Sequence, residues 1–356
     1  MAGSGNKLTL LPLASVAILA LAACQNGYYA QSIRGHLDLL SGRERVERLV
    51  ASPDTPEDLR AQLILTTDIR AFAATVLALP GADSYTTYVD LGRDYVTMNV
   101  VATPELSLRP LTWCFPVFGC VAYRGYFDQA DAVAYGNELR AAGLDVAIGG
   151  SSAYSTLGWF RDPLLNTMLY AAPYRIAGNI FPELAHQRLY IPNDSAFNES
   201  YAVAVERAGV RLWLDAVGSP ELFADYERST ERQEDFVRLV LGAKGELEAL
   251  YASAVSDQDK RRGKAAIIAA LRADYQDLRA SWGGYPGYDG WFAQDLNNAH
   301  FAGVATYNTY VAAFTELLDE VGGDFALFHA AVAGLGRLDP AERAATLERL
   351  GAAAGA

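Results

Sequence analysis

The second half of this 356-residue chain contains a succession of helix start and stop signals, and this feature constrains the fold most. Ser219-Pro220-Glu221 combines a capping residue, a first-turn proline and an acid, which is how helices begin. The helix predicted there runs to about Ser253. The other predicted helices cover 257–281, 297–322, 324–333 and the segment after Asp339-Pro340, with an aromatic, Gly-rich loop at 285–291. We therefore expect a helical part over about 163–350, with an antiparallel helical pair in it.

The first half mixes helical and extended patterns. Residues 84–101 are rich in Tyr, Thr and Val, and they predict a hairpin around Gly92. The remaining expectations are helices over 28–51, 54–79 and 128–143, an extended segment over 112–127 and a strand over 144–150. These segments predict a small sheet over about 84–150. Because linker signals are sparse and no repeat is evident, we expect one mainly helical α+β domain over 24–356.

Composition excludes several classes of protein. The formal net charge is −13, which is unfavourable for nucleic-acid binding because phosphate neutralisation needs excess Lys and Arg. Hydrophobic residues make up 51% of the chain, which excludes wholesale disorder. With three cysteines and four histidines, the chain is neither a cysteine-rich zinc module nor a disulfide-dense scaffold. Any metal site must therefore use very few histidines.

The amino terminus has the pattern of an export signal. Lys7 is the only charge in residues 1–24, and an apolar stretch of small residues follows from Leu8 to Ala23. Leu21-Ala22-Ala23-Cys24 resembles a bacterial lipobox, in which Cys24 would be lipidated and become the first mature residue; a plain signal peptide is the alternative. Gln25 follows the cysteine, which resembles the sorting signal of bacterial lipoproteins that go to the outer membrane. We expect residues 1–23 to be removed, leaving a net charge of −14, with the chain tethered by lipid.

The other two cysteines lie six residues apart. Cys114 and Cys120 occur in WCFPVFGC, where Pro116 and Gly119 permit a turn between them. Because an exported protein reaches an oxidising compartment, a disulfide is the favoured interpretation and two buried thiols the alternative.

The segment 177–202 carries the pattern with most chemistry in it. Glu183-Leu184-Ala185-His186 is E-x-x-H on a predicted helix, and Glu199 lies 13 residues further on, after a Pro192-Asn193-Asp194 turn. Zincin metallopeptidases use H-E-x-x-H because residues four apart share a helix face and can reach one zinc ion. Here the first-ligand position is Pro182, which has no metal-binding atom. By spacing alone, a metal site and a buried His paired with a neighbouring acid both remain open.

Longer segments carry a family resemblance. GYYAQ (27–31), WCFPVFGCVAYRGYF (113–127), AYSTLGWFRDPLLNTML (153–169), FPELAHQRLY (181–190) and AFNESYA (196–202) resemble a family of bacterial aminopeptidases of gluzincin type. The resemblance covers essentially the whole mature chain and implies a zincin-like fold, one zinc ion and peptide substrates. It implies that Glu183 is the general base and that His186 and Glu199 are zinc ligands. This chain departs from the family pattern, F-H-E-L-A-H-Q, at Pro182.

A few other residues are candidates for the site. His300, in the family-like segment LNNAHFAGVATY, is the candidate replacement ligand, with an ordinary helical His as the alternative. Tyr307 and Tyr310 are candidates for oxyanion stabilisation, although packing explains most tyrosines. The remaining candidates have simpler structural interpretations: His36 and His329 as helical residues, Asp194 as a turn cap, and Trp159 and Phe160 as packing residues.

Two hypotheses for function follow. The first is a lipid-anchored zinc aminopeptidase of the bacterial envelope, on the outer membrane facing the periplasm, in which Glu183 takes a proton from zinc-bound water. The second is a pseudoenzyme that binds peptides or has a structural role, because Pro182 leaves only two of the three protein ligands that catalytic zinc usually has. The sequence does not specify the peptide or the oligomeric state.

Overall fold

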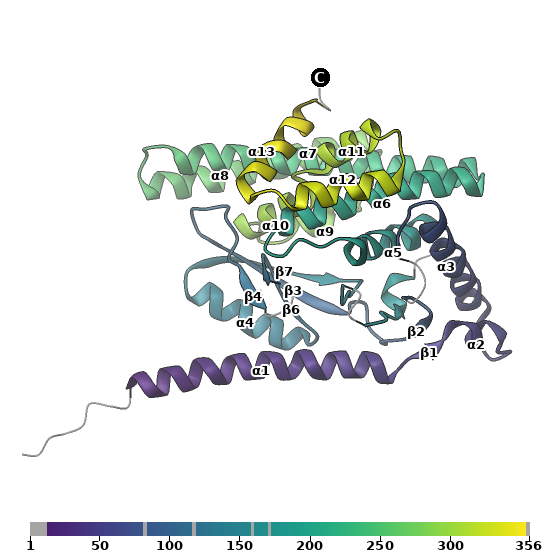
Figure 1. Ribbon diagram of the computed structural model, residues 1–356. Coiled ribbons are helices and arrows are strands. Elements are labelled where there is room, and N and C mark those ends of the chain that lie inside the picture. Colours follow the sequence, from purple (N-terminus) through teal and green to yellow (C-terminus); the bar gives the residue numbers. More distant parts are fainter. Residues whose placement is uncertain (1–12, 81–83, 116–118, 158–159, 170–171, 354–356) are drawn as a thin grey trace, which may run out of the picture.

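A computed structural model describes residues 13–80, 84–115, 119–157, 160–169 and 172–353. Three layers are visible in Figure 1. The long helix α1 (Leu13–Ser41) runs along one side, small sheets lie in the middle, and most helices of the second half form the opposite layer. The fold is mainly helical with small sheets, so the predicted α+β class is confirmed.

The strands form two three-stranded sheets and one hairpin. In the first sheet β2 (Thr87–Val89) lies between β1 (Glu44–Arg45), antiparallel, and β8 (Leu164–Leu165), parallel. In the second, β3 (Thr97–Pro104) lies between β6 (Arg124–Tyr126) and β7 (Leu144–Ser151), both antiparallel. The hairpin joins β4 (Trp113–Phe115) to β5 (Gly119–Val121).

The predicted hairpin around Gly92 is wrong. Gly92 does turn the chain, with φ +59°, but β2 and β3 on either side of it pair in different sheets. The helix predicted over 28–51 is also interrupted, because the chain leaves α1 at Ser41, pairs through β1 and restarts as α2 (Val46–Ala51). In both cases pairing with distant segments overrides the local pattern.

The predicted helices of the second half are largely present. Ser219 caps α7 (Pro220–Ala252) by accepting from the Leu222 N–H, and Ser256 caps α8 (Asp257–Ser281) in the same way. The segment 297–322 divides into α10 (Asn298–Asn308) and α11 (Val311–Glu320). The other helices are α3 (Glu57–Thr75), α4 (Gln129–Ala141), α5 (Pro173–Arg188), α6 (Ser195–Val217), α9 (Asp289–Phe292), α12 (Phe325–Gly336) and α13 (Pro340–Ala353), with a 3-10 turn at Asn166–Met168.

The main core surrounds α5 and α6, which pack against each other, and it includes residues from α3, α11, α12 and α13. A second cluster lies between α7, α8, α9 and α10, and a third lies under the β3 sheet and α4. The helices that carry the E-x-x-H segment and Glu199 are thus fixed by the largest core.

Candidate functional site

Helix α5 separates its core face from a polar face. Ile176, Ile180 and Leu184, one turn apart, are completely buried, so they hold the helix against the main core. Pro182, Glu183 and His186 lie around the opposite side of the helix. Pro182 stands inside the helix, four residues before His186 and therefore on the same face. The backbone thus has the arrangement that an H-E-x-x-H segment requires, although the first side chain has no ligating atom.

The turn between α5 and α6 brings Glu199 to this face. The side chain of Asn198, 1% exposed, accepts from the Ile191 N–H at 2.8 Å and donates to the Ile191 carbonyl at 2.7 Å. Asp194 caps α6 by accepting from the Phe197 N–H, and it pairs with Arg343 of α13 at 2.8 Å. The predicted chain reversal is therefore present, and Asp194 serves as a helix cap.

His186 and Glu199 face each other directly. The His186 Nε2 atom lies 3.5 Å from Glu199 Oε2, and the two side chains are 12% and 13% exposed. Burial lowers the pKa of His186, but the adjacent Glu199 carboxylate and the nearby Glu183 raise it by more, so the net shift is upward. The other ring nitrogen, Nδ1, is buried and has no hydrogen-bond partner among the residues that the structure describes. The structure thus places an imidazole with a raised pKa directly against a carboxylate.

Glu183 lies in the same group of charges. Burial raises the pKa of Glu183 to about 7; His186 opposes this shift, whereas the negative Glu199 and Asp162 reinforce it. The Ser155 hydroxyl donates to the Glu183 carboxylate. A carboxyl group with a pKa near neutrality can accept and release protons, which is what a general base needs.

Tyrosines line the Glu199 side of this group. The negative charge of Glu199, and then burial, raise the pKa of Tyr307 well above its usual value. Burial and the same carboxylate raise the pKa of Tyr123, which precedes β6. Tyr307 is 41% exposed as a residue, and its raised pKa keeps the hydroxyl protonated and therefore a hydrogen-bond donor. Tyr310 lies elsewhere: its backbone N–H donates to Ser200, and its charged neighbours are Asp194, Glu348 and Arg343.

The disulfide hairpin leads the chain to Tyr123. Cys114 and Cys120 form a disulfide across the β4–β5 pair. The Cys120 N–H donates to the side chain of Asn193, in the α5–α6 turn, at 2.8 Å. Gly119 has φ +72°, and a Cβ atom there would lie 2.7 Å from the Asn193 side-chain oxygen. The close approach of hairpin and turn therefore requires glycine.

Sequence reasoning missed a second polar group beside Glu183. Asp162, 1% exposed, accepts hydrogen bonds from Thr156, from Ser155 and from Gln187 of α5. The Ser155 hydroxyl therefore lies within reach of both Asp162 and Glu183, and it donates its single proton to one of them at a time. The available signal was the family-like segment 153–169, which contains both Ser155 and Asp162 but no recognised motif.

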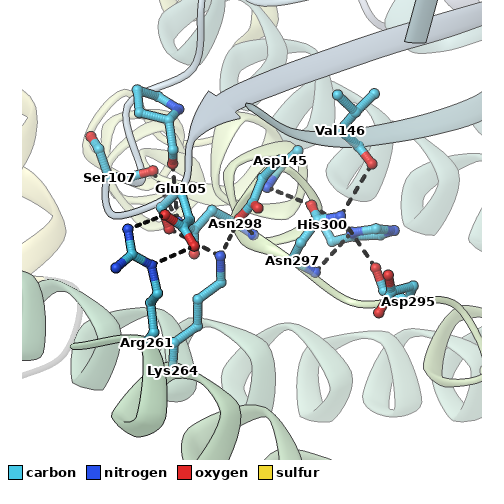
Figure 2. A network of polar contacts seen from close by, with 12 residues as sticks. Glu105, Ser107, Asp145, Val146, Arg261, Lys264, Asp295, Asn297, Asn298 and His300 are labelled. Atoms are coloured by element: carbon cyan, nitrogen blue, oxygen red, sulfur yellow. Dashed lines mark hydrogen bonds and ion pairs between the residues drawn. The ribbon is translucent and has the colours of Figure 1, made fainter. Parts of the chain in front are cut away.

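His300 is engaged in a different part of the molecule. It closes the capping box of α10, where its Nδ1 atom accepts from the Asn297 N–H at 3.2 Å (Figure 2), and its Nε2 atom lies 3.3 Å from Gln294 Oε1. His329 bonds Tyr201 and the Leu77 carbonyl at 2.9 Å each. His36 packs against Phe160, with ring centroids 4.9 Å apart. Trp159 lies outside the described residues, as does the side chain of Cys24.

The donor atoms do not fit a catalytic zinc ion. Pro182 contributes no ligand, and His300 is committed to its capping box. Within the described ranges, no group of three or more His, Cys, Asp or Glu side chains is placed to hold a metal ion. Catalytic zinc usually has three protein ligands, and among the described residues the expected ligand positions supply His186 and Glu199 alone.

A family model described as "Putative aminopeptidase" matches residues 27–347, and the chain therefore belongs to this family. No curated protein and no solved structure matches the chain. Membership supports a peptidase-like function in general terms. In the part of the chain that the structure describes, no helix is long and apolar enough to cross a membrane.

Proposed function

We propose that this chain is a peptide-binding member of its family, in which the zinc-dependent step has been lost. The observation that carries the proposal is Pro182, which occupies the first-ligand position on the correct face of an intact α5. The rest of the group is retained, with Glu183, His186, Glu199 and Tyr307 together. The substitution therefore removes a ligand without dismantling the site.

The remaining charges suit the amino end of a peptide. Two carboxylates, Glu183 and Glu199, face a single imidazole, His186. When Glu183 is ionised the group carries net negative charge, which attracts an ammonium ion in partly buried surroundings. Tyr307 adds a hydroxyl for the peptide backbone. Glu183 would hold or release a proton at its carboxyl group, and no hydrolytic step is assigned to it.

The decisive experiment measures metal content and peptide binding together. We expect the wild-type chain to purify without stoichiometric zinc and to bind trialanine more tightly than N-acetyl-trialanine, since acetylation removes the ammonium group. Pro182→His supplies the missing imidazole four residues before His186 and should bind zinc. Pro182→Ala is the matched control, because it restores the helical N–H without adding a ligand.

Stoichiometric zinc in the wild-type protein, together with hydrolysis that a chelator abolishes, would overturn the proposal in favour of a zinc aminopeptidase. Equal binding of the free and acetylated peptides would exclude recognition of the amino end. If Pro182→His binds no zinc, the geometry inferred for His186 and Glu199 is wrong.

We also propose that the mature chain is anchored by lipid at Cys24, on the outer membrane of the bacterial envelope and facing the periplasm. The support is the lipobox-like Leu21-Ala22-Ala23-Cys24 after an apolar stretch, followed by Gln25. Mass spectrometry of the mature amino terminus tests this anchor. An unmodified Cys24, or cleavage at another position, would refute it.

A further inference from the structure

The carboxyl-terminal half of α1 is apolar on two faces. Its inner face packs on the folded body: Tyr28 lies with its ring 5.4 Å from the Tyr126 ring and under the Arg124 guanidinium at 4.0 Å. Further along, Gly35 lies so close to the Phe127 ring that a Cβ atom would collide with it, and Leu39 is 2% exposed. From Tyr28 onward the helix is therefore a fixed part of the fold.

The outer face carries a stripe of exposed apolar side chains. Tyr29, Ile33 and Leu37 are spaced four residues apart and are 38%, 60% and 56% exposed. This spacing aligns them along one side of a helix. In Figure 1 the helix α1 lies at the edge of the molecule, so its outer face points away from the sheets and the helical layer. We call these three residues the outer stripe.

We propose that the outer stripe lies on the lipid bilayer surface and fixes the orientation of the protein there. This inference rests on the lipid anchor proposed at Cys24. Tyr28, where docking to the body begins, lies only four positions after Cys24. Four residues rise about 6 Å in a helix and reach at most about 14 Å when extended. A tether this short holds α1 near Tyr28 against the membrane, and the stripe continues from that point.

Local charge and area both favour a bilayer over a second copy of the chain. Residues 27–48 carry four arginines against three acids, in a chain whose net charge is −13, so the part nearest the anchor is repelled by anionic lipid less than the chain as a whole. A stable protein interface buries about 800 Å² on each partner, which three side chains do not supply. An apolar stripe on an interfacial helix needs only shallow burial among headgroups.

Site-directed spin labelling of the processed, acylated protein tests the inference. Ile33→Cys introduces one reactive thiol, because Cys114 and Cys120 are joined and the thiol of an acylated Cys24 is blocked. Leu327→Cys on α12 is the matched control, since Leu327 is 56% exposed in the opposite layer. Each protein is reconstituted in vesicles of phosphatidylethanolamine and phosphatidylglycerol. Collisions of the label with oxygen and with a nickel complex are then measured.

The inference predicts that the label at position 33 loses access to nickel and gains access to oxygen, while the label at position 327 stays accessible to nickel. A nickel-accessible label at 33 in protein whose Cys24 acylation is verified by mass spectrometry overturns the inference and leaves the anchor standing. Dipolar broadening between labels at 33 shows a contact between two copies and also overturns it. An unmodified Cys24 overturns both the anchor and the inference built on it.

Discussion

Two buried polar groups of this protein contain a histidine, acids and a helix terminus, yet they are organised differently. The polar contacts of Glu105, Asp145, Asn297, Asn298 and His300 at the amino end of α10 form what we call the α10 junction (Figure 2). Both ring nitrogens of His300 have partners there, and burial lowers its pKa to about 4. In the candidate site, His186 has a raised pKa, faces Glu199 and keeps an unpaired Nδ1 atom. The His300 imidazole is neutral and has a partner at each ring nitrogen, whereas the His186 imidazole is incompletely satisfied among the described residues.

This difference indicates which of the two polar clusters stabilises the fold and which is suited to binding a ligand. Buried polar atoms are normally hydrogen-bonded, because an unpaired group costs about 1–3 kcal/mol. The α10 junction follows this rule, and its hydrogen bonds join α10 to α7, to β7 and to the end of β3. The candidate site departs from this rule at His186, and burial there raises the pKa of the Glu183 carboxyl to about 7. Such departures concentrate at functional sites. The predictions below test this contrast through stability.

The largest expected effect is in the α10 junction. Asn298, completely buried, donates to the carbonyls of Pro104, Glu105 and Ser107 and accepts from the Tyr251 hydroxyl at 2.9 Å. Asn298→Ala leaves these groups unpaired. We expect a loss of about 3–4 kcal/mol in the free energy of unfolding, measured by urea denaturation.

The matched control for this variant is Asn137→Ala on α4, where the asparagine is exposed and its carbonyl accepts from Arg140. We expect the control to change stability by less than about 0.5 kcal/mol. Similar losses for the two variants would show that the α10 junction does not hold the fold together.

The α10 junction also shows why the sequence predicted some features and not others. Helix starts at Pro220 and Asp257 were predictable because their caps are local. Glu183, His186 and Glu199 were brought into one hypothesis by helical spacing and by the family resemblance. In contrast, the partners of Asn298 are nearly two hundred residues away, and Ser155 and Asp162 approach Glu183 from a segment without a motif. Such contacts depend on packing between distant segments, which spacing does not encode.

A change of opposite sign is expected at Glu183. Burial raises its pKa in the folded state to about 7, above the ordinary value of 4.5, so the folded protein binds more protons than the unfolded chain between these values. The contribution of this group to stability is therefore complete below pH 4.5 and is lost as the pH rises through 7. Glu183→Gln removes the charge that is penalised at high pH. We expect the variant to be more stable than wild type at pH 8 by about 2 kcal/mol, after allowing for partial exposure.

The measurement is urea unfolding of wild type and Glu183→Gln at pH 8 and pH 4.5, where the difference should nearly vanish. Glu206→Gln is an informative comparison on α6, because burial also raises the pKa of Glu206 to about 7 and Arg207 opposes the shift. If Glu183→Gln has the same effect at both pH values, the pKa of Glu183 is the same in the folded and unfolded states and the electrostatic description of the site is wrong.

The smallest effect is expected at Glu105, the acid at the rim of the α10 junction. The Arg261 guanidinium binds this carboxylate through two contacts of 2.8 Å and lowers its pKa. The stability that this pair adds is therefore present above the ordinary carboxyl pKa and is lost as the pH falls, the reverse of Glu183. Because the two side chains are 43% and 52% exposed, we expect Glu105→Gln to lower stability at pH 8 by less than about 0.5 kcal/mol.

Urea unfolding of Glu105→Gln at pH 8 in low and high salt checks this last expectation. Added salt should shrink the difference from wild type, because exposed charges are screened over about 10 Å at 0.1 M ionic strength. A loss above about 1 kcal/mol that persists in high salt would show that the rim carboxylate supports the fold as strongly as a buried group does. The exposed Glu105–Arg261 ion pair would then count among the contacts that hold the fold together. The contrast between the α10 junction and the candidate site would then rest on Asn298 alone.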